Sequence, residues 1–350
     1  MHYLSHLLKS YNFSNKNLDY LSTKTFEDLL LKHGLTKCFP PSLAIYDVVD
    51  NIVLCRNLNN IHPAVKLRAI TYVDYINRLI NKFCINFPSN SSFIIDISDG
   101  CSHRSILEEI PTVCLSASVP NTKTIPALPF SDVHYLLPQY KEKFLGIVYD
   151  SDFHKKKNIL SWRGNACPTL DPYIPTGSSK WINSRIDFCK RYFNHPKMDI
   201  GFSRFGEPNT TWQIPYLKFK KPKLSTQQMS KSKIIANITG IASSYDAPFW
   251  IMQSGSVMLW IIQNEFELAR DNSPLWIMWY YDLLEPYIHY IPSTIDKVEE
   301  NIEWCFAHPD ECKKITVQAR NICSHILSIW DESNAMILKC IIDNSLIAGL

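Results

Sequence analysis

The chain has 350 residues, of which 46% are hydrophobic and 20% are charged, and this composition excludes disorder and collagen-like structure. The formal net charge of +3 comes from interspersed basic and acidic residues, so nucleic-acid binding is not the expected function. The length predicts two domains of ordinary size. The lysines between 155 and 157 and between 218 and 223 are expected to lie on solvated loops.

The cysteines and the apolar segments bear on where the protein resides. The 11 cysteines include no C-x-x-C pair, which argues against a disulfide framework or a zinc ribbon. His and Lys interrupt the apolar run of the N-terminal segment MHYLSHLLKSY, so it does not resemble a secretory signal. The stretch 247–262 is too short to span a membrane. We expect a cytoplasmic protein without a transmembrane segment, and contact with a membrane surface stays open.

The first half of the chain alternates between helix and strand signals. Apolar residues recur at helical spacing from Lys66 to Phe83 and predict a helix. The run FIIDI from Phe93 predicts a buried strand, and the runs starting at Thr112 and Phe144 continue the alternation. Residues 1–150 are therefore expected to form an α/β domain with a mostly parallel sheet.

The second half, residues 151–350, repeats this alternation after a polar stretch around Ser151–Asn158 that predicts the domain boundary. Helices are expected to close the chain, one of them starting at a capping box of Asp296 and Glu299. The other expected elements are a strand at 159–162 that ends at Arg163 and Gly164, a helix at 181–192, a strand at 233–239, a helix around 249–252, a strand at 257–262 and a helix with Ile315, Ala319 and Ile326 on one face.

A turn with the form of a phosphate-binding site follows the strand at 233–239. In open α/β sheets, ligands bind where the strands end, because glycine turns and helix N-termini there present backbone N–H groups. The run from Asn237 through Gly240 to Ser244 has this form. The same pattern is also an ordinary connection between a strand and a helix.

Two stretches of the second half carry a resemblance to a known family. They are SKIIANITGIASSYDAPFWIMQSGSV from Ser232 and YYDLLEPYIHYIP from Tyr280. In this order they resemble the signature of glycosyltransferase family 90, which includes protein O-glucosyltransferases, capsule xylosyltransferases and lipopolysaccharide-modifying enzymes. WRGN at Trp162–Asn165, followed by Arg185, is similar to the Arg-Gly turn and the downstream Arg of that family. The resemblance runs from about residue 93 to the end of the chain.

The resemblance implies a GT-B fold, in which two Rossmann-like domains face a cleft. Residues 1–150 would carry the catalytic base, and residues 151–350 would bind a UDP-sugar. It further implies inverting transfer of glucose or xylose, without a metal or other cofactor, to a hydroxyl group of a glycan or protein. A glycan acceptor is the stronger expectation, because no secretory signal is visible.

The resemblance also places the site residues. Asp99 matches the family's base, with Asp96 in reserve, although Asp before Gly100 is also a common turn residue. Where glucosyltransferase members carry an Arg after the Ser-containing turn, this chain has Asp246. The donor-binding residues that the resemblance indicates are Trp162, Arg163, Gly164, Asn165, Arg185, Gly240, Ser243, Ser244, Tyr245, Gly255, Ser256 and His289.

Two alternatives stay open. Asp150 and Asp152 end an apolar run in the D-x-D form that anchors a divalent ion in GT-A transferases. Alternatively, the chain is a non-catalytic relative that binds a glycan or a nucleotide, which Asp246 favours. Tyr245 and Trp250 suit stacking on uracil, but core packing is the commoner explanation at their spacing.

Overall fold

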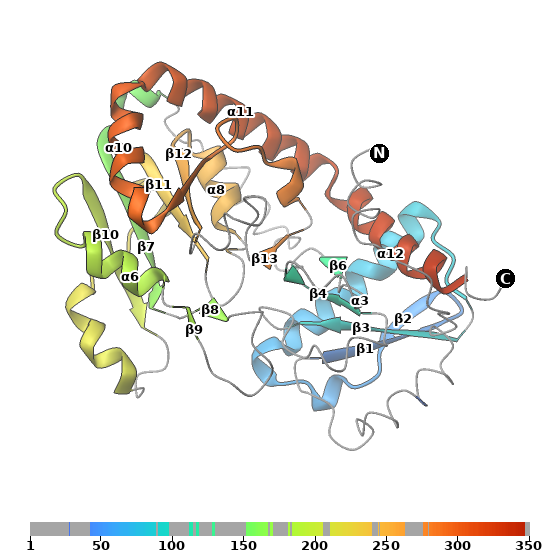
Figure 1. Ribbon diagram of the computed structural model, residues 1–350. Coiled ribbons are helices and arrows are strands. Elements are labelled where there is room, and N and C mark those ends of the chain that lie inside the picture. Colours follow the sequence, from blue (N-terminus) through green and yellow to red (C-terminus); the bar gives the residue numbers. More distant parts are fainter. Residues whose placement is uncertain are drawn as a thin grey trace. The chain divides into compact units, whose positions relative to one another are not determined.

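The computed structural model describes residues 28, 43–88, 90–97, 112–114, 117–118, 128–129, 152–166, 169–170, 181–182, 184–205, 211–239, 244, 246–262, 276–278 and 280–346. The chain is mixed α/β and divides into two compact units (Figure 1). Unit 1 consists of Met1–Leu137, Trp276–Trp279 and Ser328–Leu350. Unit 2 consists of Pro138–Leu275 and Tyr280–Leu327.

The end of the chain, Ser328–Leu350, belongs to unit 1. The predicted second domain, residues 151–350, had included it. Helix α12 (Trp330–Leu346) contacts helix α3 (Pro63–Phe83). Asp331, in the first turn of α12, accepts from Lys82 Nζ at 2.8 Å and from Arg78 Nη2 at 3.3 Å. These basic side chains attach the last helix to α3, so the closing helices are shared between the units.

Unit 1 contains a five-stranded sheet of order β2-β1-β3-β4-β6. The expected sheet is mostly parallel, but β1 is antiparallel to both β2 and β3. The reason is a hairpin whose two-residue turn, Asp50-Asn51, has positive φ at both positions. The strands are β1 (Leu43–Val49), β2 (Ile52–Cys55), β3 (Ser91–Asp96), β4 (Thr112–Cys114) and β6 (Leu128–Pro129), and β3, β4 and β6 are parallel.

Helix α3 covers one face of this sheet and confirms the helix predicted at 66–83. Tyr72 and Ile76 on its inner face are fully buried. The Tyr46 hydroxyl of β1 donates to the Ala69 carbonyl at 3.0 Å. Ile70, which shares the predicted helical pattern, is nevertheless 40% exposed.

Unit 2 contains a parallel five-stranded sheet of order β10-β7-β11-β12-β14. The predicted strands at 159–162, 233–239 and 257–262 are confirmed. The strands are β7 (Lys157–Ala166), β10 (Met198–Phe205), β11 (Ser232–Ile238), β12 (Val257–Ile262) and β14 (Ile291–Thr294).

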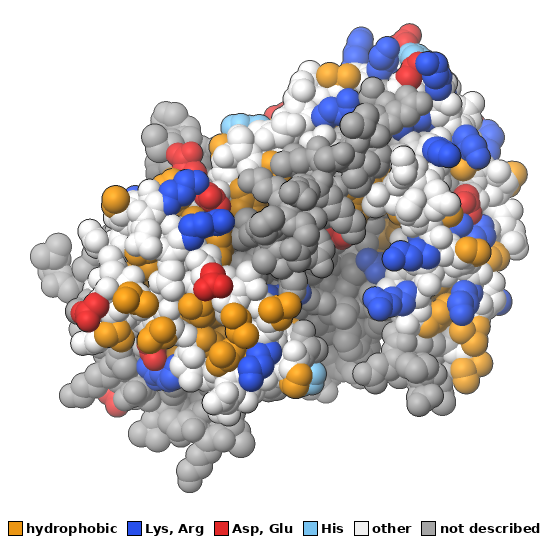
Figure 2. Space-filling view, turned by 180° about the vertical axis from the view of Figure 1, so that it is seen from behind, with side chains coloured by type: hydrophobic (Ala, Val, Ile, Leu, Met, Phe, Trp, Pro, Cys, Tyr) orange, Lys and Arg blue, Asp and Glu red, His pale blue; other side chains and the backbone are white. Residues whose placement is uncertain are grey.

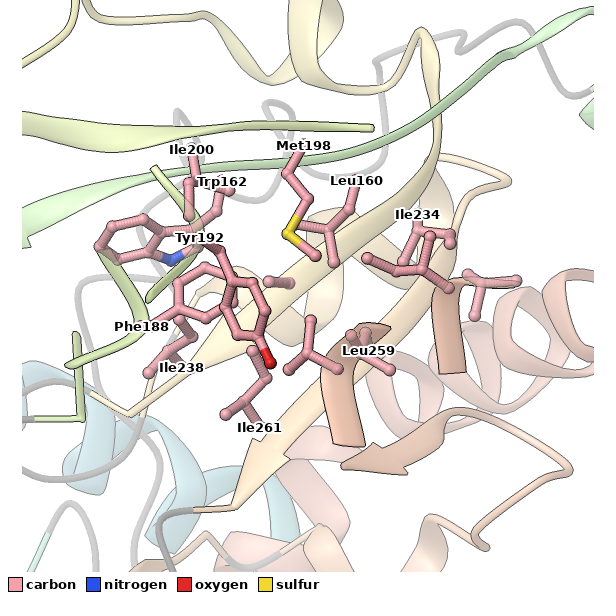
Figure 3. Packing of buried hydrophobic residues seen from close by; sticks show 14 of the residues in the cluster. Leu160, Trp162, Phe188, Tyr192, Met198, Ile200, Ile234, Ile238, Leu259 and Ile261 are labelled. Carbon is pink, nitrogen blue, oxygen red and sulfur yellow. The ribbon is translucent and has the colours of Figure 1, made fainter. Parts of the chain in front are cut away.

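Helices cover both faces of this sheet. The predicted helices appear as α6 (Ser184–Tyr192), α8 (Ala247–Gln253) and α11 (Pro309–Ser328). Helix α6 begins later than the predicted start at residue 181, because Trp181 and Ile182 pair as a short strand with Thr169 and Leu170. One hydrophobic cluster joins the strands to α6, to α10 (Val298–Ala307) and to the start of α11. Figure 3 shows Trp162, Phe188 and Tyr192 packed with the aliphatic side chains of this cluster. Alternate strand residues face α8 instead, so both faces are buried, as the apolar runs of parallel strands require.

The predicted capping box at Asp296 is wrong. A 3-10 turn, η7 (Ile295–Lys297), precedes α10 and makes Lys297 its N-cap, and no side chain caps this helix. Asp296 pairs with Arg191 instead. A capping box occurs before α7 (Thr226–Met229), where Ser225 and Gln228 hydrogen-bond reciprocally.

The remaining elements are short connections between these layers. In the described part of the chain, no helix is both long and apolar enough to cross a membrane. The described cysteines Cys55, Cys84, Cys189, Cys305, Cys312 and Cys323 are free thiols. The short elements are β5 (Ala117–Ser118), β8 (Thr169–Leu170), β9 (Trp181–Ile182), β13 (Trp276–Ile277), η2 (Leu58–Asn60), η4 (Phe153–Lys155), η5 (Thr211–Phe219) and η6 (Tyr281–Leu283).

Gly164 of β7 is required by the packing of Trp162. A Cβ atom at this position would lie 2.4 Å from Cζ2 of the Trp162 indole. We expect Gly164→Ala to lower the free energy of unfolding by about 1 to 3 kcal/mol, because overpacking displaces a buried ring. Denaturant unfolding of the full chain measures this.

The double variant Trp162→Phe/Gly164→Ala tests the cause, since the smaller ring vacates the position of Cζ2. It should lose less stability than the sum of the two single variants. Strict additivity of the three measurements would contradict the steric explanation.

Candidate functional site

The chain changes direction across the sheet of unit 2 between β7 and β11. From β7 it passes to the edge strand β10, returns to β11 on the other side of β7, and then continues to β12 and β14. In sheets of this order, ligands bind at the carboxyl ends of the strands that flank the switch point. The candidate site is therefore the edge of the sheet where β7 ends at Ala166 and β11 ends at Ile238.

Arg185 joins the ends of these two strands. Its Nη1 donates to the Asn165 carbonyl at 3.2 Å, and its Nη2 donates to the Ile238 carbonyl at 3.0 Å. The guanidinium carbon lies 5.9 Å from the ring centre of Trp162. Arg185 is the second residue of α6, so a cation and a helix N-terminus lie together at the switch point. Both favour an anion there.

Two asparagines lie at the same edge, on one face of the sheet. Ile235 pairs with Ser161. Because side chains alternate along strands, this register places Asn165 and Asn237 on the same face. Within the described residues, neither Asn165 Oδ1 nor Asn237 Nδ2 has a hydrogen-bond partner, although both atoms are buried. A buried polar atom left unpaired costs about 1 to 3 kcal/mol, so a ligand group that pairs with these atoms is favoured.

Trp260 extends this polar set onto the next strand. It pairs with Asn237 across β11 and β12, so the two side chains share a face. Its ring packs against Tyr281 and Tyr290 at centroid distances of 4.7 and 5.0 Å. The buried indole Nε1 has no acceptor among the described residues. One unpaired acceptor and two unpaired donors therefore lie on this face.

Ser244 is the described residue of the predicted phosphate turn. Its hydroxyl donates to Asn237 Oδ1 at 2.5 Å, which attaches the turn to β11. The structure thus brings Ser244, Asn165 and Arg185 to one edge of the sheet. The predicted site residues Gly240, Ser243 and Tyr245 lie outside the described residues.

The predicted Arg-Gly turn at Trp162–Asn165 is wrong, because these residues lie inside β7. Pairing with β10 continues to Ala166 and keeps this segment extended. Trp162 is a core residue that packs edge-on against Phe188 and Phe202. Gly164 gives its indole room, as described above.

Arg163 points to the opposite face from Trp162 and is occupied by protein groups. Its Nη2 lies 2.7 Å from Asp199 Oδ1, its Nη1 donates to the Asp199 carbonyl at 2.8 Å, and its Nε donates to the Pro222 carbonyl at 3.0 Å. Its side chain is 5% exposed. These contacts give Arg163 a structural role between the strands and the following loop.

Gly255 and Ser256 lie where strands begin, at the edge opposite Arg185. Ser256 Oγ donates to the Ser232 carbonyl at 2.7 Å, and Lys156 Nζ donates to the Ser254 carbonyl at 3.0 Å. These bonds tie together the starts of β7, β11 and β12. Gly255 has a φ of 72°, which explains glycine in this turn. The structure does not bring these two residues together with Arg185.

His289 closes the turn that precedes β14. Its Nδ1 accepts a hydrogen bond from the Glu285 N–H at 2.8 Å. Tyr287 within this turn has a φ of 63°. Burial lowers the pKa of His289 below its ordinary value, although the charge of Glu285 opposes the shift. The segment YYDLLEPYIHYIP from Tyr280 therefore contains a turn that a neutral His289 stabilises.

The predicted carboxylates lie in unit 1 or at the start of unit 2. Asp99 and Asp150 lie outside the described residues. Asp96 ends β3 and is fully buried. Asp152 is the N-cap of η4 and accepts from the His154 N–H at 3.2 Å. A hydrogen bond from Lys155 lowers the pKa of Asp152.

The described residues include no group of three or more His, Cys, Asp or Glu side chains arranged to hold a metal ion. Transfer without a metal stays a prediction. Trp250, which was expected either to stack on uracil or to pack in the core, is buried in α8.

The sequence prediction named Asn237 only as the start of the phosphate-turn run, and it did not name Trp260 as a candidate site residue. A usable signal for Asn237 was present, because it is an amide near the end of the otherwise apolar strand IIANI. Trp260 carries no such signal, since a tryptophan in the run VMLWII is typical of a buried strand.

Comparison with known proteins gives two partial similarities. No protein-family model matches the chain. Uncharacterized protein 179R of Invertebrate iridescent virus 6 is 28% identical over 187 residues, which make up 49% of this chain and 15% of that protein. Uncharacterized protein 035R of Invertebrate iridescent virus 3 is 29% identical over 114 residues, which make up 30% of this chain and 10% of that protein. The chain thus spans a small part of these relatives, and neither name assigns an activity.

We expect Arg185→Ala to lower the free energy of unfolding by about 1.5 to 3 kcal/mol, because two strand-end carbonyls lose a charged donor. Denaturant unfolding measures the loss. Arg191→Ala on the same helix is the control. Its ion pair with Asp296 is exposed and should be worth about 0 to 1 kcal/mol. Equal losses in the two variants would show that Arg185 does not join β7 to β11.

The lowered pKa of His289 predicts a pH dependence of stability. Below the ordinary pKa of 6.5, the unfolded chain binds a proton that the folded chain still excludes. Stability contributed by neutral His289 is therefore present above that value and lost as pH falls through the folded pKa. We expect His289→Gln to flatten the decline in unfolding free energy between about pH 7 and pH 5.

Proposed function

We propose that the chain is a nucleotide-sugar-dependent glycosyltransferase and that its donor nucleotide binds at the switch point of unit 2. The observation that carries the proposal is Arg185, which is held at the carboxyl ends of β7 and β11 beside the N-terminus of α6. A diphosphate is the anion that such a position commonly receives in doubly wound sheets.

Unpaired polar atoms near the carboxyl ends of the neighbouring strands support a ligand with both donors and acceptors. Asn165 Oδ1 can accept from a hydroxyl or ring N–H, and Asn237 Nδ2 and Trp260 Nε1 can donate to oxygen atoms. A uracil edge and a ribose each present such groups. A UDP-sugar therefore fits the chemistry of this edge, and the resemblance to glycosyltransferase family 90 favours glucose or xylose as the sugar.

Unit 1 would supply the base and the acceptor side of a GT-B arrangement. In an inverting transfer, the Asp99 carboxylate takes the proton of the acceptor hydroxyl, and the hydroxyl oxygen forms a bond to the anomeric carbon. The bond from that carbon to the diphosphate breaks, and UDP leaves with the electron pair. Arg185 and the N-terminus of α6 would stabilise the negative charge on the leaving diphosphate.

A non-catalytic nucleotide- or glycan-binding protein is the second candidate. The observation that favours it is Asp246, the N-cap residue of α8, where glucosyltransferase members carry an Arg. An added carboxylate at a helix that follows the phosphate turn opposes a diphosphate. Such a protein would bind UDP without turning over a UDP-sugar.

Two variants separate binding from chemistry. UDP titration by calorimetry and UDP release from a panel of UDP-sugars in excess chelator are measured on the full chain. Asn165→Ala should weaken UDP binding about tenfold or more, with little loss of stability, because its Oδ1 has no hydrogen-bond partner among the described residues. Asp99→Asn should abolish UDP release and leave UDP affinity unchanged.

Asn194→Ala, at an exposed position of unit 2, is the matched control and should behave as wild type. If UDP binds and no UDP-sugar is turned over, the second candidate is correct. If UDP does not bind, or if Asn165→Ala binds it as well as wild type does, the donor site lies elsewhere. Turnover that requires a divalent ion would support the D-x-D alternative.

A further inference from the structure

Exposed aliphatic residues and lysines occur together on η5 and the segment after it. Ile214 is 63% exposed and Leu217 is 49% exposed. Side chains three residues apart in a 3-10 helix lie on the same side, so Ile214 and Leu217 form one exposed aliphatic pair. Lys218, Lys220 and Lys223 follow and are exposed. We call residues 214–223 the lysine strip.

The lysine strip is fixed to the edge strand of the sheet. Phe219 is buried and contacts Phe193, with ring centroids 5.3 Å apart. The Lys221 N–H donates to the Phe202 carbonyl at 2.8 Å. A Cβ atom on Gly201 would lie 2.9 Å from the Phe219 carbonyl oxygen, so the strip packs closely on β10. Its exposed residues are thus presented by a rigid support.

All charged residues of the strip are positive. Residues 214–223, IPYLKFKKPK, contain four lysines and no Asp or Glu. Asp199 of β10 is adjacent, but its carboxylate is 2.7 Å from Arg163 and 3.0 Å from Lys221. Burial alone would raise the pKa of Asp199, but the hydrogen bonds from Arg163 and Lys221 outweigh it and lower that pKa. Figure 2 shows Lys and Arg side chains next to hydrophobic ones on the surface of unit 2.

We propose that the lysine strip docks unit 2 on the surface of an anionic phospholipid membrane. Ile214 and Leu217 would enter the boundary between headgroups and acyl chains, and the lysines would contact the lipid phosphates and carboxylates. Neither signal suffices alone, but an apolar anchor combined with a basic cluster gives stable peripheral binding. This surface is independent of the proposed transferase activity.

The exposed aliphatic pair, Ile214 and Leu217, favours a membrane over a nucleic acid as the partner. Phosphate contacts in nucleic-acid complexes come from basic and polar side chains, and single-stranded sites add aromatic stacking platforms. Ile214 and Leu217 serve neither purpose, but insertion into a lipid interface removes them from water.

Vesicle co-sedimentation of the full chain tests the proposal. The chain should bind vesicles of phosphatidylcholine mixed with phosphatidylserine and not vesicles of phosphatidylcholine alone, and added salt should weaken binding. Ile214→Ser/Leu217→Ser and Lys218→Glu/Lys220→Glu/Lys223→Glu should each weaken binding by about tenfold or more. Far-UV circular dichroism confirms that the variants are folded.

Matched controls place the same changes elsewhere. Ile52→Ser/Leu54→Ser changes two equally exposed aliphatic residues of unit 1. Lys231→Glu/Lys313→Glu/Lys314→Glu changes three exposed lysines outside the strip. Both should bind anionic vesicles as wild type does. Equal loss in the controls, equal binding to neutral vesicles, or binding of a single-stranded oligonucleotide through the strip without vesicle binding would each overturn the proposal.

Discussion

The hydrogen bonds of Arg185 to the carbonyls of Asn165 and Ile238 are the contact on which the candidate site depends. Strands β7 and β11 lead into crossovers that run in opposite directions across the sheet. These two parallel strands therefore separate at their carboxyl ends. The guanidinium joins the two strands beyond the last pair of their ladder, which is Ile235 with Ser161. It also places a cation in the first turn of α6.

A buried polar atom without a hydrogen-bond partner destabilises the folded chain. Several such atoms lie near the carboxyl ends of the strands of unit 2. Asn165 Oδ1, Asn237 Nδ2 and Trp260 Nε1 are buried and unpaired within the described residues. The opposite edge is different, since Ser254, Ser256 and Lys156 satisfy one another and the strand starts. One end of the sheet is thus completed by its own side chains, whereas the other has capacity left for a ligand. This asymmetry is what doubly wound sheets show at functional sites.

Local patterns predicted the elements of unit 2 well and its site only in part. The strands at 233–239 and 257–262 follow from apolar runs, since both faces of a parallel sheet are buried. Trp162–Asn165 looks like a turn because Arg-Gly ends an apolar run, yet pairing with β10 holds it extended. Gly255 and Ser256 share a motif with Ser244 but lie at the other edge, because α8 carries the chain across the sheet between them. Whether a residue lies at the carboxyl ends or at the amino ends of the strands depends on strand direction, which a sequence motif alone does not specify.

The return of the chain to unit 1 at residue 328 has a practical consequence for anyone who divides this protein. A fragment that stops after residue 137 would lack α12 and with it the carboxylate of Asp331, leaving Arg78 and Lys82 of α3 without their counter-ion. A fragment that contains only the second half would carry α12 without the helix it covers. Separate expression of the halves should therefore join residues 328–350 to the amino-terminal piece through a designed linker.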